Sequence, residues 1–213
     1  MQNKKVVIIS LVVLIAIFFG AGFLYKQNES AKIEAIAKQK AQVLQRPYSI
    51  VIGNKDAKVQ LVEFFDPACE TCAQFHPYVK DIMKKHEGKI KLVLRYAPFH
   101  KNSNYAVKML EGARAQGLFM ETLEFMFQTQ KYWINGHTVD PRKLWGMLVN
   151  VKGLDMQKLA VSMEDKESDR RIEQDLKDVK ELGQTKTPAY LVNGKPLQNF
   201  GLDQLINLIE SEL

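Results

Sequence analysis

The stretch KVQLVEFFDPACETC, residues 58–72, decides the fold of this chain. Its first part, residues 58–65, ends in a nearly continuous apolar run, which is typical of a central strand covered on both faces. Asp66-Pro67 then supplies a cap and helix-entry signal, and a helix is predicted over about residues 69–86. Two cysteines therefore stand where a buried strand passes into a helix.

The segments on either side of this stretch predict an α/β plan. Alternating or apolar runs predict further strands, and residues 58–96 should form a parallel βαβ unit. Between about residues 102 and 182 strand signals vanish, and the apolar spacing there predicts four or five helices. The predicted elements outside residues 58–86 are strands at 49–52, 89–96 and 189–192, a turn at Asn193-Gly194 followed by Pro196-Leu197, and a last helix at 202–213. The fold class is thus α/β with a helical insertion.

The N-terminal segment predicts a membrane anchor. Lys4-Lys5 precedes an apolar run at residues 6–25, and twenty helical residues span about 30 Å, the thickness of the hydrocarbon core. We expect residues 1–26 to be a single-pass anchor in the inner (cytoplasmic) membrane, although Gly20-Ala21-Gly22 could serve as the cleavage site of a signal peptide. The positive flank places everything after Lys26 outside the cytoplasm, in the periplasm or an equivalent extracytoplasmic space.

Residues 27–46 are polar and rich in alanine, with apolar residues at helical spacing. We expect a helical stalk there, with a dimerising helix as the alternative. The folded domain then occupies residues 47–213.

The composition limits the function further. The chain has 213 residues, of which only two are cysteines, so no framework of disulfides holds the fold together. The formal net charge is +6, but basic and acidic residues alternate and no block of like charges occurs. Nucleic acid is therefore not an expected partner.

The spacing of Cys69 and Cys72 points to redox chemistry. At the start of a helix, unpaired N–H groups and the helix dipole stabilise a thiolate, so Cys69 is the expected nucleophile. Cys72 lies one turn on, where it can close a disulfide with Cys69. Two alternatives remain, namely a buried structural pair of thiols and a copper or zinc carrier that uses Cys69, Cys72 and His76. Covalent haem attachment needs a histidine at position 73, which is Ala73.

Other polar residues complete the predicted site. Glu63 lies inside the apolar strand, where burial should raise its pKa and make it a proton carrier for the resolving thiol. Thr187-Pro188 precedes the strand at 189–192, and a cis bond there would expose backbone groups to an extended substrate. The four histidines are scattered in sequence and are expected at the surface: His76, His86, His100 and His137.

Together these motifs resemble the DsbA family of bacterial thiol–disulfide oxidoreductases. The resemblance rests on Glu63 six residues before the Cys-x-x-Cys motif, on the long helical block, and on the late Thr187-Pro188, and it covers about residues 48–213. It implies a thioredoxin-like fold with a helical insertion. It also implies that Cys69 is the nucleophile, Cys72 the resolving thiol, Glu63 the buried acid and Pro188 the cis-proline of the substrate groove.

The expected activity is disulfide exchange with cysteine-containing exported proteins, and a membrane redox protein should recycle the enzyme. No cofactor or metal is required. A reductase or isomerase of periplasmic thiols, including one for cytochrome assembly, is the alternative within the same chemistry.

The dipeptide between the cysteines predicts a moderate redox potential. Well-known oxidases of the family carry Pro-His there, whereas this chain carries Glu70-Thr71, and an acid next to Cys69 should raise the thiol pKa. A less stabilised thiolate makes the disulfide less oxidising, so we expect a potential below that of strongly oxidising members. Equilibration with a glutathione buffer measures this redox potential, and a value of about −120 mV would contradict the prediction.

Overall fold

The computed structural model describes residues 14, 20, 27 and 41–213. The chain divides into two units, Met1–Gln42 and Val43–Leu213, and the second holds all the strands and helices described below. The predicted anchor at 1–26, apart from positions 14 and 20, and most of the predicted stalk at 27–46 lie outside the described residues. Among those described, no helix combines the length and the apolar character needed to cross a membrane.

A five-stranded sheet forms the centre of the second unit. Its strand order is β1-β3-β2-β6-β7, with β2 and β3 parallel and the other neighbours antiparallel. The parallel pair confirms the βαβ unit expected from the sequence. The strands are β1 (Ile50–Gly53), β2 (Val59–Phe65), β3 (Ile90–Tyr96), β6 (Ala189–Val192) and β7 (Lys195–Pro196).

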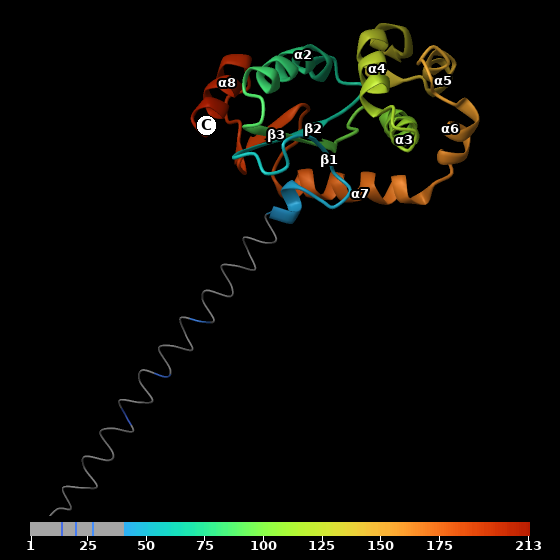
Figure 1. Ribbon diagram of the computed structural model, residues 1–213. Coiled ribbons are helices and arrows are strands. Elements are labelled where there is room, and N and C mark those ends of the chain that lie inside the picture. Colours follow the sequence, from blue (N-terminus) through green and yellow to red (C-terminus); the bar gives the residue numbers. More distant parts are fainter. Residues whose placement is uncertain (1–13, 15–19, 21–26, 28–40) are drawn as a thin grey trace, which may run out of the picture. The chain divides into compact units, whose positions relative to one another are not determined.

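Helices cover both faces of this sheet. Figure 1 shows α2 and α8 on one face, α7 along the other, and α3 to α6 gathered beside the sheet. Five helices, α3 to α7, lie between β3 and β6 in the sequence. The helices are α2 (Glu70–Lys85), α3 (Ser103–Arg114), α4 (Phe119–Trp133), α5 (Pro141–Leu148), α6 (Met156–Ser162), α7 (Lys166–Glu181) and α8 (Leu202–Glu210).

One expectation about the helical block was wrong. The block contains a second, two-stranded sheet, formed by β4 (Ile134–Asn135) and β5 (Thr138–Val139) around the turn at Gly136-His137. Gly136 and His137 both adopt positive φ angles, 52° and 62°, as a tight turn between paired strands requires. Strands of two residues are too short to show a period of two, so the sequence pattern showed only an interruption of the helical periodicity.

The alternation of side chains along β2 divides the core into two parts. Leu61 and Phe65 pack with α2 and the helical block, whereas Val62 and Phe64 pack with Val179 of α7. Both faces are buried, as the apolar run predicts. The chemistry-bearing Glu63 shares the side of β2 that faces α2.

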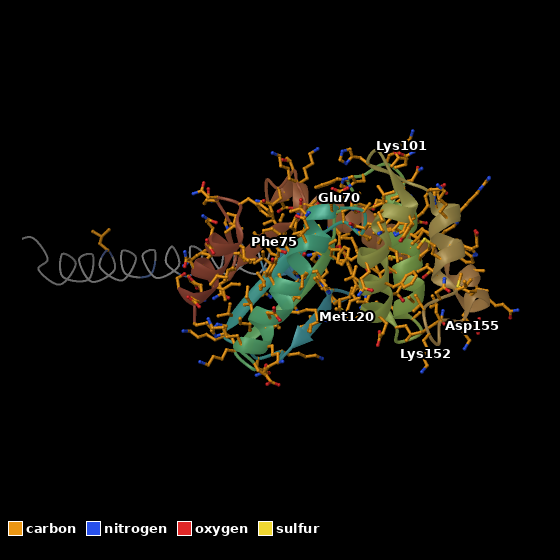
Figure 2. All side chains as sticks on the ribbon, turned by 90° about the horizontal axis from the view of Figure 1, so that it is seen from above. Glu70, Phe75, Lys101, Met120, Lys152 and Asp155 are labelled. Atoms are coloured by element: carbon orange, nitrogen blue, oxygen red, sulfur yellow. The ribbon has the colours of Figure 1, made fainter. Side chains whose placement is uncertain are left out.

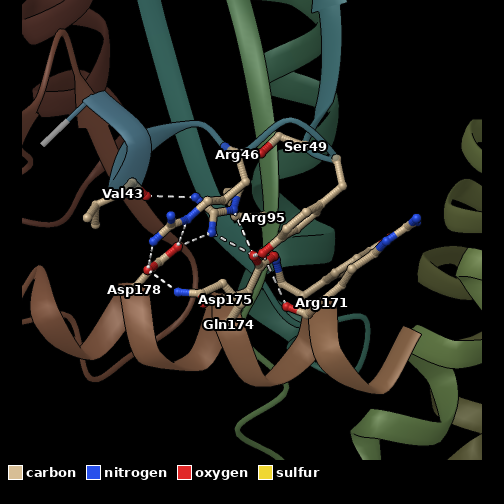
Figure 3. Close-up of polar contacts among 10 residues, drawn as sticks. Val43, Arg46, Ser49, Arg95, Arg171, Gln174, Asp175 and Asp178 are labelled. Carbon is tan, nitrogen blue, oxygen red and sulfur yellow. Dashed lines mark hydrogen bonds and ion pairs between the residues drawn. The ribbon is translucent and has the colours of Figure 1, made fainter. Parts of the chain in front are cut away.

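The face toward α7 contains a buried network of charges, drawn in Figure 3. Arg95 of β3 has no exposed surface, and its guanidinium donates to Asp175 at 2.9 and 2.6 Å and to Asp178 at 2.6 Å. It also donates to the carbonyl of Val43 at 2.7 Å. Arg46 donates to Asp178 at 2.7 and 2.6 Å, so two arginines face two aspartates. The network fixes α7 and the start of the domain onto β3.

Asp175→Ala should destabilise the domain strongly. It removes a carboxylate that also accepts from Tyr48 Oη and from the backbone N–H of Tyr96, and it leaves Arg95 buried with a partner missing. We expect the free energy of unfolding to fall by about 3–5 kcal/mol in urea denaturation. The control is Glu210→Ala, which removes an exposed ion pair with Lys85 and should cost about 0–1 kcal/mol. Equal losses in the two variants would contradict the role given to the network.

Candidate active site

Cys69 is the N-cap residue of α2. Its Sγ accepts a hydrogen bond from the backbone N–H of Cys72 at 3.4 Å, so the sulfur occupies the position that a capping oxygen usually takes. The helix therefore begins where the sequence predicts, at about residue 69, but the predicted cap at Asp66-Pro67 was wrong, because Cys69 itself is the cap. Asp66 instead closes the turn before the helix: its carboxylate accepts from Ala68 N–H at 2.8 Å and its carbonyl from Cys69 N–H at 2.9 Å.

The carboxylate of Asp66 joins this turn to the connection between β3 and α3. It is fully buried and accepts from His100 at both the backbone N (2.9 Å) and Nδ1 (2.8 Å), and from the hydroxyl of Ser103. In Figure 2, Glu70 at the start of α2 and Lys101 of the connection lie at the same end of the molecule. Asp66 thus holds the nucleophile turn against a loop that is 34 residues away in sequence.

His100 is a residue of the site that sequence reasoning missed. The hydrogen bond to Asp66 raises the pKa of His100 against the opposing effect of burial, and the charges of Asp66, Cys69 and Glu70 raise it further. Its ring stacks on that of His137 at 5.7 Å between centroids. His137 is exposed, as expected of a surface histidine, whereas His100 is partly buried beside Asp66. The fold brings the two rings together although their loops are far apart in the sequence.

The helical insertion also contributes to the turn that carries Cys69. Gln130 of α4 is buried, and its Nε2 donates to the carbonyls of Pro67 (2.9 Å) and Cys69 (3.0 Å). Nothing in the sequence marked Gln130, which sits among aromatic residues. The insertion thus supports the geometry of the nucleophile directly.

The two thiols have opposite environments. Cys69 has 5% of its surface exposed, whereas Cys72 has none, and both are free thiols. The hydrogen bond from the Cys72 thiol lowers the pKa of Cys69 to about 6 against the effect of burial, and the Thr187 side chain and the backbone N–H groups of Cys72 and Thr71 lower it further. Burial, followed by the interactions with Cys69, raises the pKa of Cys72 well above its ordinary value. This difference matches the properties of an attacking and a resolving thiol.

Glu63 lies behind the cysteines on the same side of the sheet as α2. It is 3% exposed, and burial raises its pKa to about 8, while a hydrogen bond from Tyr190 Oη at 3.2 Å acts in the opposite direction. The negative charge of Cys69 raises it as well, and the charge of Glu63 in turn raises the pKa of Cys72. The carboxyl group is therefore electrostatically coupled to both thiols.

The Thr187–Pro188 peptide bond is cis, and the Thr187 carbonyl accepts a hydrogen bond from Cys69 Sγ at 3.2 Å. Thr71, Thr187 and Pro188 line a groove of about 400 Å³ beside the nucleophile. Phe200, with 53% of its surface exposed, forms part of this groove and packs against Phe75 with tilted rings, at 4.8 Å between ring centroids. The groove offers both backbone groups and an apolar surface next to Cys69.

The two residues between the cysteines face different recesses. Thr71 belongs to the groove at Pro188, whereas Glu70 is exposed and lines a second recess with Lys131 and His137 of the helical block. The expected effect of Glu70 on the thiol pKa stays a prediction.

A Cys-x-x-Cys pair capping a helix after a central strand, opposite a cis-proline, defines a dithiol protein of thioredoxin fold. The chain belongs to the thioredoxin family, because the model of the family described as Thioredoxin matches residues 45–211. The predicted thioredoxin-like fold with a helical insertion is confirmed for this part of the chain.

Solved structures of related proteins agree with this assignment. A thioredoxin-like oxidoreductase from Silicibacter pomeroyi is 25% identical, and the match covers 80% of this chain and 95% of the oxidoreductase, with a TM-score of 0.69. BdbD from Bacillus subtilis is 24% identical (77% and 92% covered, TM-score 0.66), and α-DsbA1 from Wolbachia pipientis is 19% identical (81% and 94% covered, TM-score 0.69). The resemblance to the DsbA family is confirmed at the level of the fold.

Curated relatives include much longer proteins. A Na⁺/H⁺ antiporter NhaA from Herminiimonas arsenicoxydans is 28% identical over 146 residues, which is 68% of this chain and 22% of the antiporter. The chain therefore spans about a fifth of the length of the curated relatives that it matches.

Alkylation of the reduced protein should separate the two thiols. Only the thiolate reacts, so the alkylation rate of Cys69 should reach a plateau above its pKa of about 6 and fall about tenfold per pH unit below it. Cys72 should stay unmodified throughout this range, because its thiol is buried and neutral. Iodoacetamide kinetics from pH 4 to 9, with Cys72→Ser and Cys69→Ser to assign each thiol, provide the measurement. A midpoint near 9 for Cys69 would contradict the environment described.

Proposed function

We propose that this protein is a thiol–disulfide oxidoreductase that exchanges disulfides with cysteine-containing proteins through Cys69 and Cys72. The observation that carries the proposal is the position of Cys69 as the cap of α2, with its pKa lowered to about 6 and the resolving thiol buried behind it. A thiolate that is stable at neutral pH is both a good nucleophile and a good leaving group in disulfide exchange.

In the oxidising direction, a substrate thiolate attacks Sγ of Cys69 in the Cys69–Cys72 disulfide. The bond between the cysteines breaks, a mixed disulfide with the substrate forms, and Cys72 leaves as a thiolate that takes a proton from Glu63. A second substrate thiolate then attacks the substrate's own sulfur and releases Cys69 as a thiolate. The substrate gains a disulfide, and the enzyme gains two electrons as its dithiol.

In the reducing direction the same atoms act in reverse. Cys69 attacks a substrate disulfide, and Cys72 resolves the mixed disulfide after giving its proton to Glu63. The raised pKa of Glu63, about 8, supports this role because the carboxyl group can both donate and accept a proton near neutral pH.

The groove at Thr187-Pro188 is the proposed binding site for substrates. An extended chain can pair with backbone groups beside the nucleophile and place apolar side chains against Phe200, which suits unfolded or incompletely folded proteins. Thr71 forms part of the same groove, so the second residue of the dipeptide contributes to substrate recognition as well as to tuning of the motif.

We place the enzyme outside the cytoplasm, held to the inner membrane by residues 1–26. The charge and hydropathy pattern of these residues supports this location, and one similar solved structure is that of a periplasmic thioredoxin-like protein from Salmonella enterica. A redox protein in the same membrane is the proposed recycling partner, since tethering both raises their effective concentration. Ion transport, named for the curated relatives, is not carried over, because the match covers 22% of the antiporter.

The alternative of a copper or zinc carrier has no support among the described residues. Within residues 41–213, no three histidine, cysteine or acidic side chains form a group suited to a metal ion. Burial lowers the pKa of His76, whose Nε2 lies 3.7 Å from Glu124 of α4. His76, which would be the third ligand of such a carrier, thus faces the helical block.

Trapping of mixed disulfides tests the proposed function. Cys72→Ser keeps the nucleophile and removes the thiol that resolves it, so covalent adducts with substrates and with the recycling protein should accumulate in the native host. Non-reducing gels and mass spectrometry identify them.

The matched control for this trap is Cys69→Ser, which keeps the buried thiol and should form no adducts. An absence of adducts in Cys72→Ser, with Cys69→Ser indistinguishable from wild type in disulfide exchange, would overturn the proposal.

A further inference from the structure

The phenol of Tyr190 meets the buried carboxyl group of Glu63 at the centre of the sheet. Tyr190 Oη donates to Glu63 Oε1 at 3.2 Å, and the two side chains are 1% and 3% exposed. Within residues 41–213, this is the one hydrogen bond that the carboxyl group of Glu63 makes. We propose that Tyr190 is a positioning residue that fixes Glu63 and sets the pH at which this acid exchanges a proton with Cys72.

The backbone places the pair with little freedom. Glu63 of β2 and Tyr190 of β6 are direct partners in the antiparallel register, and both side chains point to the side of the sheet covered by α2. The ring of Tyr190 also packs against Phe75 of α2, at 6.1 Å between centroids. The phenol is thus held by one strand and one helix, with its hydroxyl directed at the carboxyl group of Glu63.

Few other charges act on Glu63. The groups that face it are Cys69 and Cys72 from α2 and Tyr190 from β6, while its register partner on β3 is the apolar Leu94. The nearby Arg95 points to the opposite face, where it binds Asp175 and Asp178. A single neutral donor is therefore the main polar influence on a carboxyl group that is otherwise desolvated.

The direction of the effect follows from the chemistry of the bond. A phenol O–H stabilises the carboxylate that accepts from it, so the bond opposes the rise in pKa that burial causes. At a pKa of about 8, roughly a tenth of Glu63 is ionised at pH 7 and can accept the proton of Cys72. Without the phenol, the ionised fraction would be smaller and the resolving step slower.

This inference rests on the proposed function, and a two-phase reaction tests each part separately. The reduced protein reacts with the aromatic disulfide 5,5′-dithiobis(2-nitrobenzoate). Cys69 attacks first, releasing one thionitrobenzoate and forming a mixed disulfide; Cys72 then displaces the second and closes the Cys69–Cys72 disulfide. Two electrons pass from the dithiol to the reagent and two protons are released. Stopped-flow absorbance follows both phases.

Tyr190→Phe should change only the second phase. We expect its pH midpoint to rise by about one unit and its rate at pH 7 to fall about tenfold, because one pKa unit is a tenfold change in the ionised fraction. The first phase should keep its midpoint near the Cys69 pKa of about 6. In a Glu63→Gln background, Tyr190→Phe should have no further effect on the second phase.

Tyr96→Phe is the matched control. It removes another buried tyrosine–glutamate hydrogen bond, from Tyr96 Oη to Glu111 at 2.5 Å, and should leave both phases unchanged. An unaltered second phase in Tyr190→Phe, equal slowing of both phases, or the same effect in Tyr96→Phe would overturn the inference. A wild-type protein without any second phase would instead refute the proposed function itself, and an unchanged second phase in Glu63→Gln would refute the role of the acid.

Discussion

A single buried carboxylate organises the active end of this protein. Asp66 accepts hydrogen bonds from the turn that leads into α2 and from the connection between β3 and α3, and it has no contact with solvent. A buried charge is tolerated only where its oxygens are satisfied, so the loops that supply the donors cannot move independently. The position of Cys69 at the tip of α2, and with it the low pKa of the thiol, depends on this constraint.

The sheet separates chemistry from stability by the alternation of its side chains. On β2, Glu63 points toward α2 and the cysteines, whereas Val62 and Phe64 point toward α7. On β3, Arg95 points toward α7 and forms the buried ion network with its two aspartates. The strands thus carry a buried acid with a raised pKa on one face and a buried charge network on the other.

The helical insertion is part of the active site rather than an appendage. Gln130 of α4 donates hydrogen bonds to the carbonyls of the turn that carries Cys69, and His137 stacks on His100, which is bound to Asp66. The thioredoxin core provides the strand, the helix and the cis-proline, and the insertion restricts how the turn between them can relax. The thioredoxin core thereby gains an active site whose polar groups come partly from the insertion.

The sequence by itself determined the features that are local. Strands β2, β3 and β6, the start of α2, the spacing of Cys69 and Cys72, and the burial of Glu63 all follow from periodicity, end signals and hydropathy within a few residues. Only the tertiary structure decided which distant groups meet. Tyr190 lies opposite Glu63 across 127 residues, and His100 and Gln130 reach the turn before Cys69 from other parts of the chain. Such pairings are set by strand register and by competition among many possible packings, and a single sequence carries no local signal for either.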